Sequence, residues 1–137
     1  MHKFLVGLYF TVLHICAIPR DYCYCLWHGL HYDLTWIFRG LPYIQVRRGS
    51  RILIGSRFTA CRSSRWNRIG VPHRAILKTV QPGAILRIGD DVGVSGCVIS
   101  AARQITIGNH VLIGSGALIV DSDAHPFNPV ARRSDVI

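Results

Sequence analysis

The stretch "ILRIGDDVGVSGCVISAARQITIGNHVLIGSGALIV", residues 85–120, decides the fold through the spacing of its apolar residues. Within it Ile107, Ile113 and Ile119 lie six residues apart, and Ile88 and Val94 keep the same spacing. A second set precedes these residues by two positions and comprises Leu86, Val92, Ile105, Val111 and Ala117. Because side chains two residues apart in a strand point to the same face, the two sets predict short strands that share one core.

A longer period lies above the hexads. The pairs Ile69-Gly70, Ile88-Gly89 and Ile107-Gly108 recur every 19 residues, which is three hexads and one corner residue. A chain with this period can wind as a triangular prism of parallel strands, each coil about 4.8 Å from the last. The spacing therefore predicts an internal column of Ile69, Ile88 and Ile107. Glycine after isoleucine would let the backbone turn each corner without a Cβ clash.

The run "RIGDDVGVSGCVISAARQITIGNHVLIGSGALIVDSDAHPFNPVARR", Arg87 to Arg133, resembles the hexapeptide-repeat acyltransferases, in particular the branch that O-acetylates sugars and polysaccharides. The resemblance extends upstream through "RSSRWNRIGVPHRAILKTVQPGA", Arg62 to Ala84. It implies an all-β fold, a left-handed parallel β-helix, over residues 41–137, usually assembled as a homotrimer. It also implies acetyl-CoA as the acyl donor, with no metal expected, and a sugar or polysaccharide hydroxyl as the acceptor.

His125 stands where the next hexad would place an inward aliphatic residue, six positions after Ile119. Pro126 follows and cannot donate to a strand ladder, so we expect the coil to open into a loop here. The resemblance implies that His125 is the general base. Neutral imidazole suits that task near neutral pH. Asp121 or Asp123 could orient the ring, and proximity favours Asp123.

The resemblance also implies an acceptor site, for which the candidate residues are Ser95, Asn109, Gly116, Arg132 and Arg133, the last two near an anionic group. Many sugar acetyltransferases carry asparagine where this chain has Gly116. Family members also continue past the histidine loop with further hexads, whereas this chain ends at Ile137. The sequence therefore predicts a β-helix truncated at its C-terminus. The alternative hypothesis is a catalytically inactive structural or binding module.

The charge balance is strongly basic, with 16 Lys and Arg against 7 acidic residues, and so predicts anionic partners. The arginines are scattered and no nucleic-acid-binding motif is visible, which argues against a nucleic-acid partner. The number of cysteines, 5, is odd and their spacing forms no disulfide pattern. We therefore expect a reducing, cytoplasmic location, at the inner face of the membrane if the N-terminal segment contacts lipid.

Residues 1–40 form a separate segment, in which the apolar stretch 4–38 predicts one or two amphipathic helices. Its longest apolar run, Phe4 to Ile18, is shorter than the roughly 20 residues of a membrane-spanning helix. These helices would cap the β-helix, the favoured interpretation, or make peripheral contact with a membrane surface.

Two groups of possible metal ligands are present. The first group, Cys23, Cys25, His28 and His31, lacks the usual zinc-site spacings, which favours packed side chains over a metal centre. The second group, His73, His110 and His125, could supply a β-helix hydratase of the carbonic anhydrase type, but the neighbouring residues do not match that family. Of these histidines, His110 is expected to be exposed at a corner.

Overall fold

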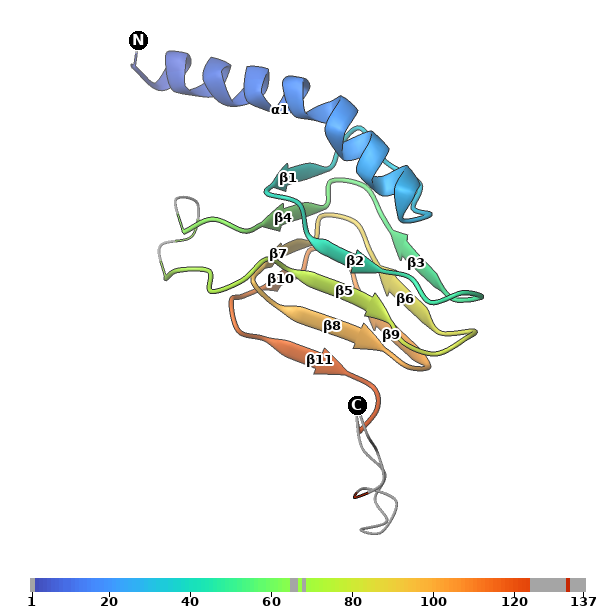
Figure 1. Cartoon of the computed structure of the whole chain (residues 1–137). Coiled ribbons are helices and arrows are strands. Elements are labelled where there is room, and N and C mark those ends of the chain that lie inside the picture. The colour runs from blue at the N-terminus through green and yellow to red at the C-terminus, as the bar shows by residue number, and fades with distance from the viewer. Residues whose placement is uncertain (1, 65–66, 68, 124–132, 134–137) are drawn as a thin grey trace.

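The computed structural model describes residues 2–64, 67, 69–123 and 133 (Figure 1). Within these described residues, helix α1 (His2–Trp27) precedes eleven short strands that build three parallel sheets. Sheet A contains β1 (Ile37–Arg39), β4 (Thr59–Cys61), β7 (Gly93–Ser95) and β10 (Leu112–Ile113). Sheet B contains β2 (Tyr43–Gln45), β5 (Ile76–Thr79), β8 (Val98–Ala101) and β11 (Leu118–Val120). Sheet C contains β3 (Arg51–Ile54), β6 (Ile85–Ile88) and β9 (Gln104–Ile107).

Consecutive strands enter sheets A, B and C in rotation, so each circuit of the chain lies beside the previous one (Figure 1). We call one such circuit a coil. This arrangement is compatible with a parallel β-helix. Matching residues of successive coils are in register, as in the column Ile52, Leu86 and Ile105 of sheet C. The hexad prediction is confirmed for Leu86, Val92 and Val94, which are almost completely buried.

The predicted column of Ile69, Ile88 and Ile107 is wrong in its first member. Ile88 pairs with Ile107, but its partner on the other side is Ile54. Ile69 is 82% exposed and lies in the long connection between β4 and β5. The corresponding connection in the next coil, between β7 and β8, contains only Gly96 and Cys97. The insertion carries an Ile-Gly pair that imitates the period without belonging to a strand.

The N-terminal prediction is also only partly right. Helix α1 ends at Trp27, and Ile37–Arg39 form β1, paired with Thr59–Cys61, instead of continuing a helix. The first strand therefore lies before residue 41, the predicted start of the β-helix. A single uninterrupted apolar stretch predicted helix throughout, but the pairing of β1 with a later strand determines its conformation.

Helix α1 lies across the end of the sheets that begins with β1 and β2 (Figure 1). Its C-terminal half packs against the core through Ile18, Tyr24 and the fully buried Cys25. The Tyr24 hydroxyl donates to the carbonyl oxygen of Pro42 at 2.6 Å. These contacts are those of a cap, as the sequence predicted. Among the helices in the described ranges, none has the length and apolar character needed to cross a membrane.

An aromatic cluster fills the core beneath α1. It contains Tyr32, Trp36, Phe38 and Phe58, whose neighbouring rings are 5.7–6.4 Å apart. The indole N–H of Trp36 donates to the carbonyl oxygen of Gly55 at 2.6 Å. This bond satisfies the one polar group of the buried indole and joins the segment after α1 to the corner that follows β3.

Candidate functional site

The acidic segment that follows β11 begins with a structural carboxylate. Asp121 accepts backbone N–H bonds from Ala102 at 2.5 Å, from Arg103 at 2.7 Å and from Gln104 at 2.7 Å. These donors form the corner of the preceding coil between β8 and β9. Burial would raise the pKa of Asp121, but the three N–H bonds outweigh it and lower the pKa. Both oxygens of this carboxylate are therefore committed to holding the coils together.

Replacing Asp121 by alanine should destabilise the fold by about 2 kcal/mol, because hydrogen bonds to a charged group contribute about 1.5–3 kcal/mol each without being additive. The folded-state pKa is depressed, so this stabilisation is present above the unfolded pKa of about 3.9 and is lost as pH falls through the folded pKa. Urea denaturation of parent and variant at pH 7 and at pH 3 measures it. An equal difference at both pH values would contradict the assignment.

Asp123 lies two residues further on and is exposed. Asp121 is bound to the preceding corner, and the choice of Asp123 as the residue that orients a catalytic histidine stays a prediction. His125 itself and Arg132 lie outside the described residues, so the general base and its pairing with Asp123 remain predictions. Arg133 is described and exposed.

The other predicted acceptor residues lie at separate places on the fold. Asn109 belongs to the corner between β9 and β10, where its side-chain oxygen accepts the N–H of Asp90 at 2.8 Å. Gly116 belongs to the corner between β10 and β11, has a φ of 82° and donates its N–H to the carbonyl oxygen of Gly96. Both residues have a clear structural task. Within one chain the described candidates do not converge on a single site.

Ser95 is the predicted residue that lies in a cavity. A trough of 420 Å³ runs along the outer side of sheet A, and Ser95 lines it beside its register partner Cys61. Two residues before Cys61 and Ser95, Thr59 and Gly93 form the neighbouring register pair on the same side of the sheet. Both are small, which keeps the trough open. A Cβ on Gly93 would approach the Leu112 side chain to 2.8 Å.

Two arginines that sequence reasoning missed border this trough, Arg39 and Arg57. Arg57 forms a two-pronged ion pair with Asp91, with N–O distances of 2.5 and 2.7 Å. Arg39 ends β1 and Arg57 lies just before β4, and only the side-by-side placement of three coils shows that they share one face. A trough with cationic borders and hydroxyl-bearing walls can accommodate a polar, anionic ligand.

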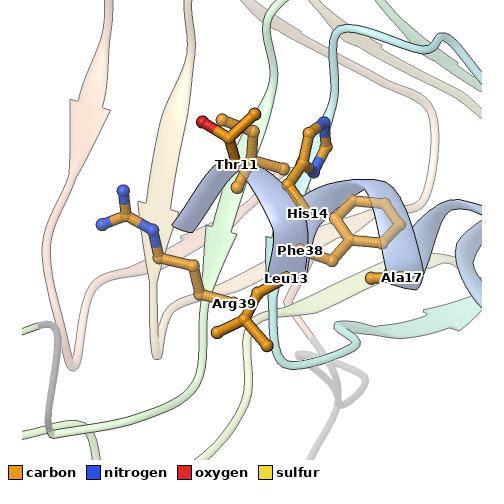
Figure 2. Close-up of a pocket in the computed structure, with 7 residues that line it drawn as sticks. Thr11, Leu13, His14, Ala17, Phe38 and Arg39 are labelled. Carbon is orange, nitrogen blue, oxygen red and sulfur yellow. The ribbon is translucent and has the colours of Figure 1, made fainter. Parts of the chain in front are cut away.

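A second cavity of 290 Å³ lies between α1 and β1 (Figure 2). Its lining residues are Thr11, Leu13, His14, Ala17, Ile37, Phe38 and Arg39. Figure 2 shows the Phe38 ring and Leu13 close beneath the helix, with the Arg39 side chain extending away from it. The lining is mainly apolar, and it includes none of the residues predicted for catalysis or acceptor binding.

The possible metal ligands are divided between different environments. Cys25 is fully buried, and burial, followed by the charge of Asp21, raises the pKa of its thiol to about 12. The ring of His28 packs on Tyr24 at 4.5 Å, and burial lowers its pKa. His110 is 77% exposed at a corner, as predicted, 3.3 Å from Asp91. Across the part of the chain that the structure describes, no three potential ligands are grouped for a metal ion.

Comparison of the chain with protein families, with characterised proteins and with solved structures found no match. The functional argument therefore rests on the residues themselves, on the rotation of the strands through three parallel sheets, and on the position of the "DSDAHP" segment directly after β11.

Proposed function

We propose that this protein is a hexapeptide-repeat acyltransferase with a left-handed parallel β-helix. In this proposal it moves an acetyl group from acetyl-CoA to a hydroxyl of a sugar or surface polysaccharide. His125 acts as the general base, and Asp123 orients its ring. The observation that carries the proposal is the combination of in-register hexads on three parallel sheets with a histidine and a proline placed just after the last described strand.

The proposed chemistry uses each residue type for what it does well. The imidazole of His125 accepts the proton of the acceptor hydroxyl as its oxygen attacks the thioester carbonyl carbon. The tetrahedral intermediate collapses with cleavage of the C–S bond, and the departing thiolate of CoA takes up the proton from the imidazolium. The trough beside Ser95 and Arg39 is our candidate for the acceptor, because hydroxyl and guanidinium groups suit a polyhydroxylated sugar.

A homotrimer follows from the same proposal. Asn109, Gly116 and Asp123 lie at different corners of one chain, so a site that used all of them would need more than one copy. Subunits packed along their outer faces could bring one corner of each chain against a neighbour's trough. The cysteines in the described ranges are all unpaired, which favours a reducing compartment such as the cytoplasm, where acetyl-CoA is available.

The test is release of free CoA thiol from acetyl-CoA in the presence of a panel of sugars and polysaccharides. We expect His125→Ala to lower kcat at least about 100-fold, the usual contribution of a positioned base, without changing the circular dichroism. His110→Ala is the matched control, because His110 is an exposed corner histidine. The rate of the parent should rise as pH passes about 6.5. If the kcat of His125→Ala stays within tenfold of the parent value, His125 is not the general base.

The second candidate function is a non-catalytic binding module, favoured by the structural tasks of Asn109 and Gly116. Titration calorimetry separates the two functions. Micromolar binding of acetyl-CoA supports the transferase, whereas binding of an anionic saccharide with no binding of acetyl-CoA supports the module. Sedimentation equilibrium tests the trimer in the same samples.

A further inference from the structure

Helix α1 presents an apolar face to the side away from the sheets. We call it the outer face, and its large exposed residues are Tyr9, Val12, Ile15, Tyr22, Leu26 and Trp27. Trp27 is 87% exposed and Ile15 is 58% exposed. At 100° per residue these positions span about 140° of the helix circumference. A contiguous apolar surface of this kind usually marks an interaction site.

Two polar residues of α1, Asp21 and Tyr24, lie on the opposite side, toward the protein. Asp21 is the sole acidic residue of the helix, and it is 1% exposed and bound to Arg20 at 2.6 Å. Tyr24 uses its hydroxyl to bond the backbone of Pro42 and Ile44. An ordinary surface helix is apolar only on the side that packs on the core, whereas α1 is apolar on its outer face as well. The described outer face therefore combines apolar and aromatic side chains with no acid.

Arginines are frequent at the end of the molecule that carries α1. Arg20 is half exposed on the helix, and residues 37–58, the coil nearest α1, contain Arg39, Arg47, Arg48, Arg51 and Arg57 and no acidic residue. Arg47 and Arg48 are both exposed. Arg57 is occupied by Asp91 of the next coil. The end of the molecule that carries α1 is thus apolar on the helix and positively charged beside it.

We infer that the outer face of α1 docks into the headgroup region of an anionic lipid bilayer, with the helix lying in the plane of the surface. The apolar side chains enter the acyl boundary, Tyr9, Tyr22 and Trp27 sit at the interface, and the arginines meet lipid phosphates. A second copy of the chain fits less well, because it would oppose Arg20 and the basic coil with their own like charges. This inference does not depend on acetyl transfer.

The test is co-sedimentation of the full chain with phosphatidylcholine vesicles that contain or lack phosphatidylglycerol. We expect the chain to bind the anionic vesicles more tightly than the neutral ones. High salt should reduce this difference in affinity, because it screens the attraction between arginines and lipid phosphates. Val12→Ser with Ile15→Ser should weaken partitioning at least about tenfold by removing buried apolar area. Leu112→Ser is the matched control, since Leu112 is 87% exposed on sheet A, and it should bind like the parent.

A second variant tests the charge. Arg47→Gln with Arg48→Gln should weaken binding to anionic vesicles about fivefold per arginine at low salt and leave binding to neutral vesicles unchanged. Equal binding to both vesicle types, or full binding by the Val12 and Ile15 variant, would overturn the inference. A third outcome would also overturn the inference: the parent does not bind vesicles but self-associates with increasing concentration, and the Val12 and Ile15 variant does not self-associate. The outer face would then bind a second copy of the chain.

Discussion

Replacing Leu86 by aspartate is expected to unfold the protein. Leu86 is completely buried in the middle strand of sheet C, between its register partners Ile52 and Ile105. An unpaired carboxylate there has no hydrogen-bond donor and costs several kcal/mol, which is comparable with the total stability of about 5–15 kcal/mol of a small domain. Loss of the β-type circular dichroism and of a cooperative thermal transition measures the effect.

Arg87→Asp is the control for this prediction. Arg87 is the next residue of β6, and its side chain is exposed on the outer side of the same sheet. We expect this variant to fold and to melt within a few degrees of the parent, because exposed substitutions usually change stability by about 0.5 kcal/mol or less. Similar melting of the two variants would mean that the assignment of inward and outward residues in β6 is wrong.

The hexad pattern predicted the part of the core that β6 and β7 contribute. Alternation in a strand and a repeat of six together specify an inward set, and Leu86, Val92 and Val94 of that set are all nearly inaccessible. The pattern did not reveal which coil stacks on which. Ile69 has the same local sequence signal as Ile54, and only the pairing of Ile54 with Ile88 distinguishes a strand from the insertion.

The candidate site was harder to predict, because polar residues at corners serve two purposes. Asp121 and Asn109 each bond a backbone N–H of the preceding coil, and a bonded corner residue and a substrate ligand have the same appearance in a sequence. The trough on sheet A was missed for a related reason. Arg39 and Ser95 are far apart in the chain, and only the in-register stacking through Cys61 aligns them on one face.

The glycines of the Ile-Gly pairs show the same dependence on stacking. The sequence predicted that glycine avoids a Cβ clash at every corner. At Gly89 this is correct, since a Cβ would collide with the Asn109 side chain and would lie 2.9 Å from backbone atoms of Gly108. At Gly108 a Cβ would meet no described atom within 4 Å. Neither glycine has a φ in the left-handed region, so local conformation does not separate them.

We therefore expect Gly89→Ala to destabilise the protein by roughly 3 kcal/mol and Gly108→Ala to change stability by about 0.5 kcal/mol or less. The added methyl group at residue 89 must displace the next coil, which strains the bond from the Gly89 N–H to the Ile107 carbonyl oxygen and the bond between Asp90 and Asn109. Thermal denaturation of the two variants measures the difference. Both substitutions change the glycine of an Ile-Gly pair, in two successive coils. Equal losses would therefore mean that the local backbone, and not the stacking of one coil on the next, requires glycine there.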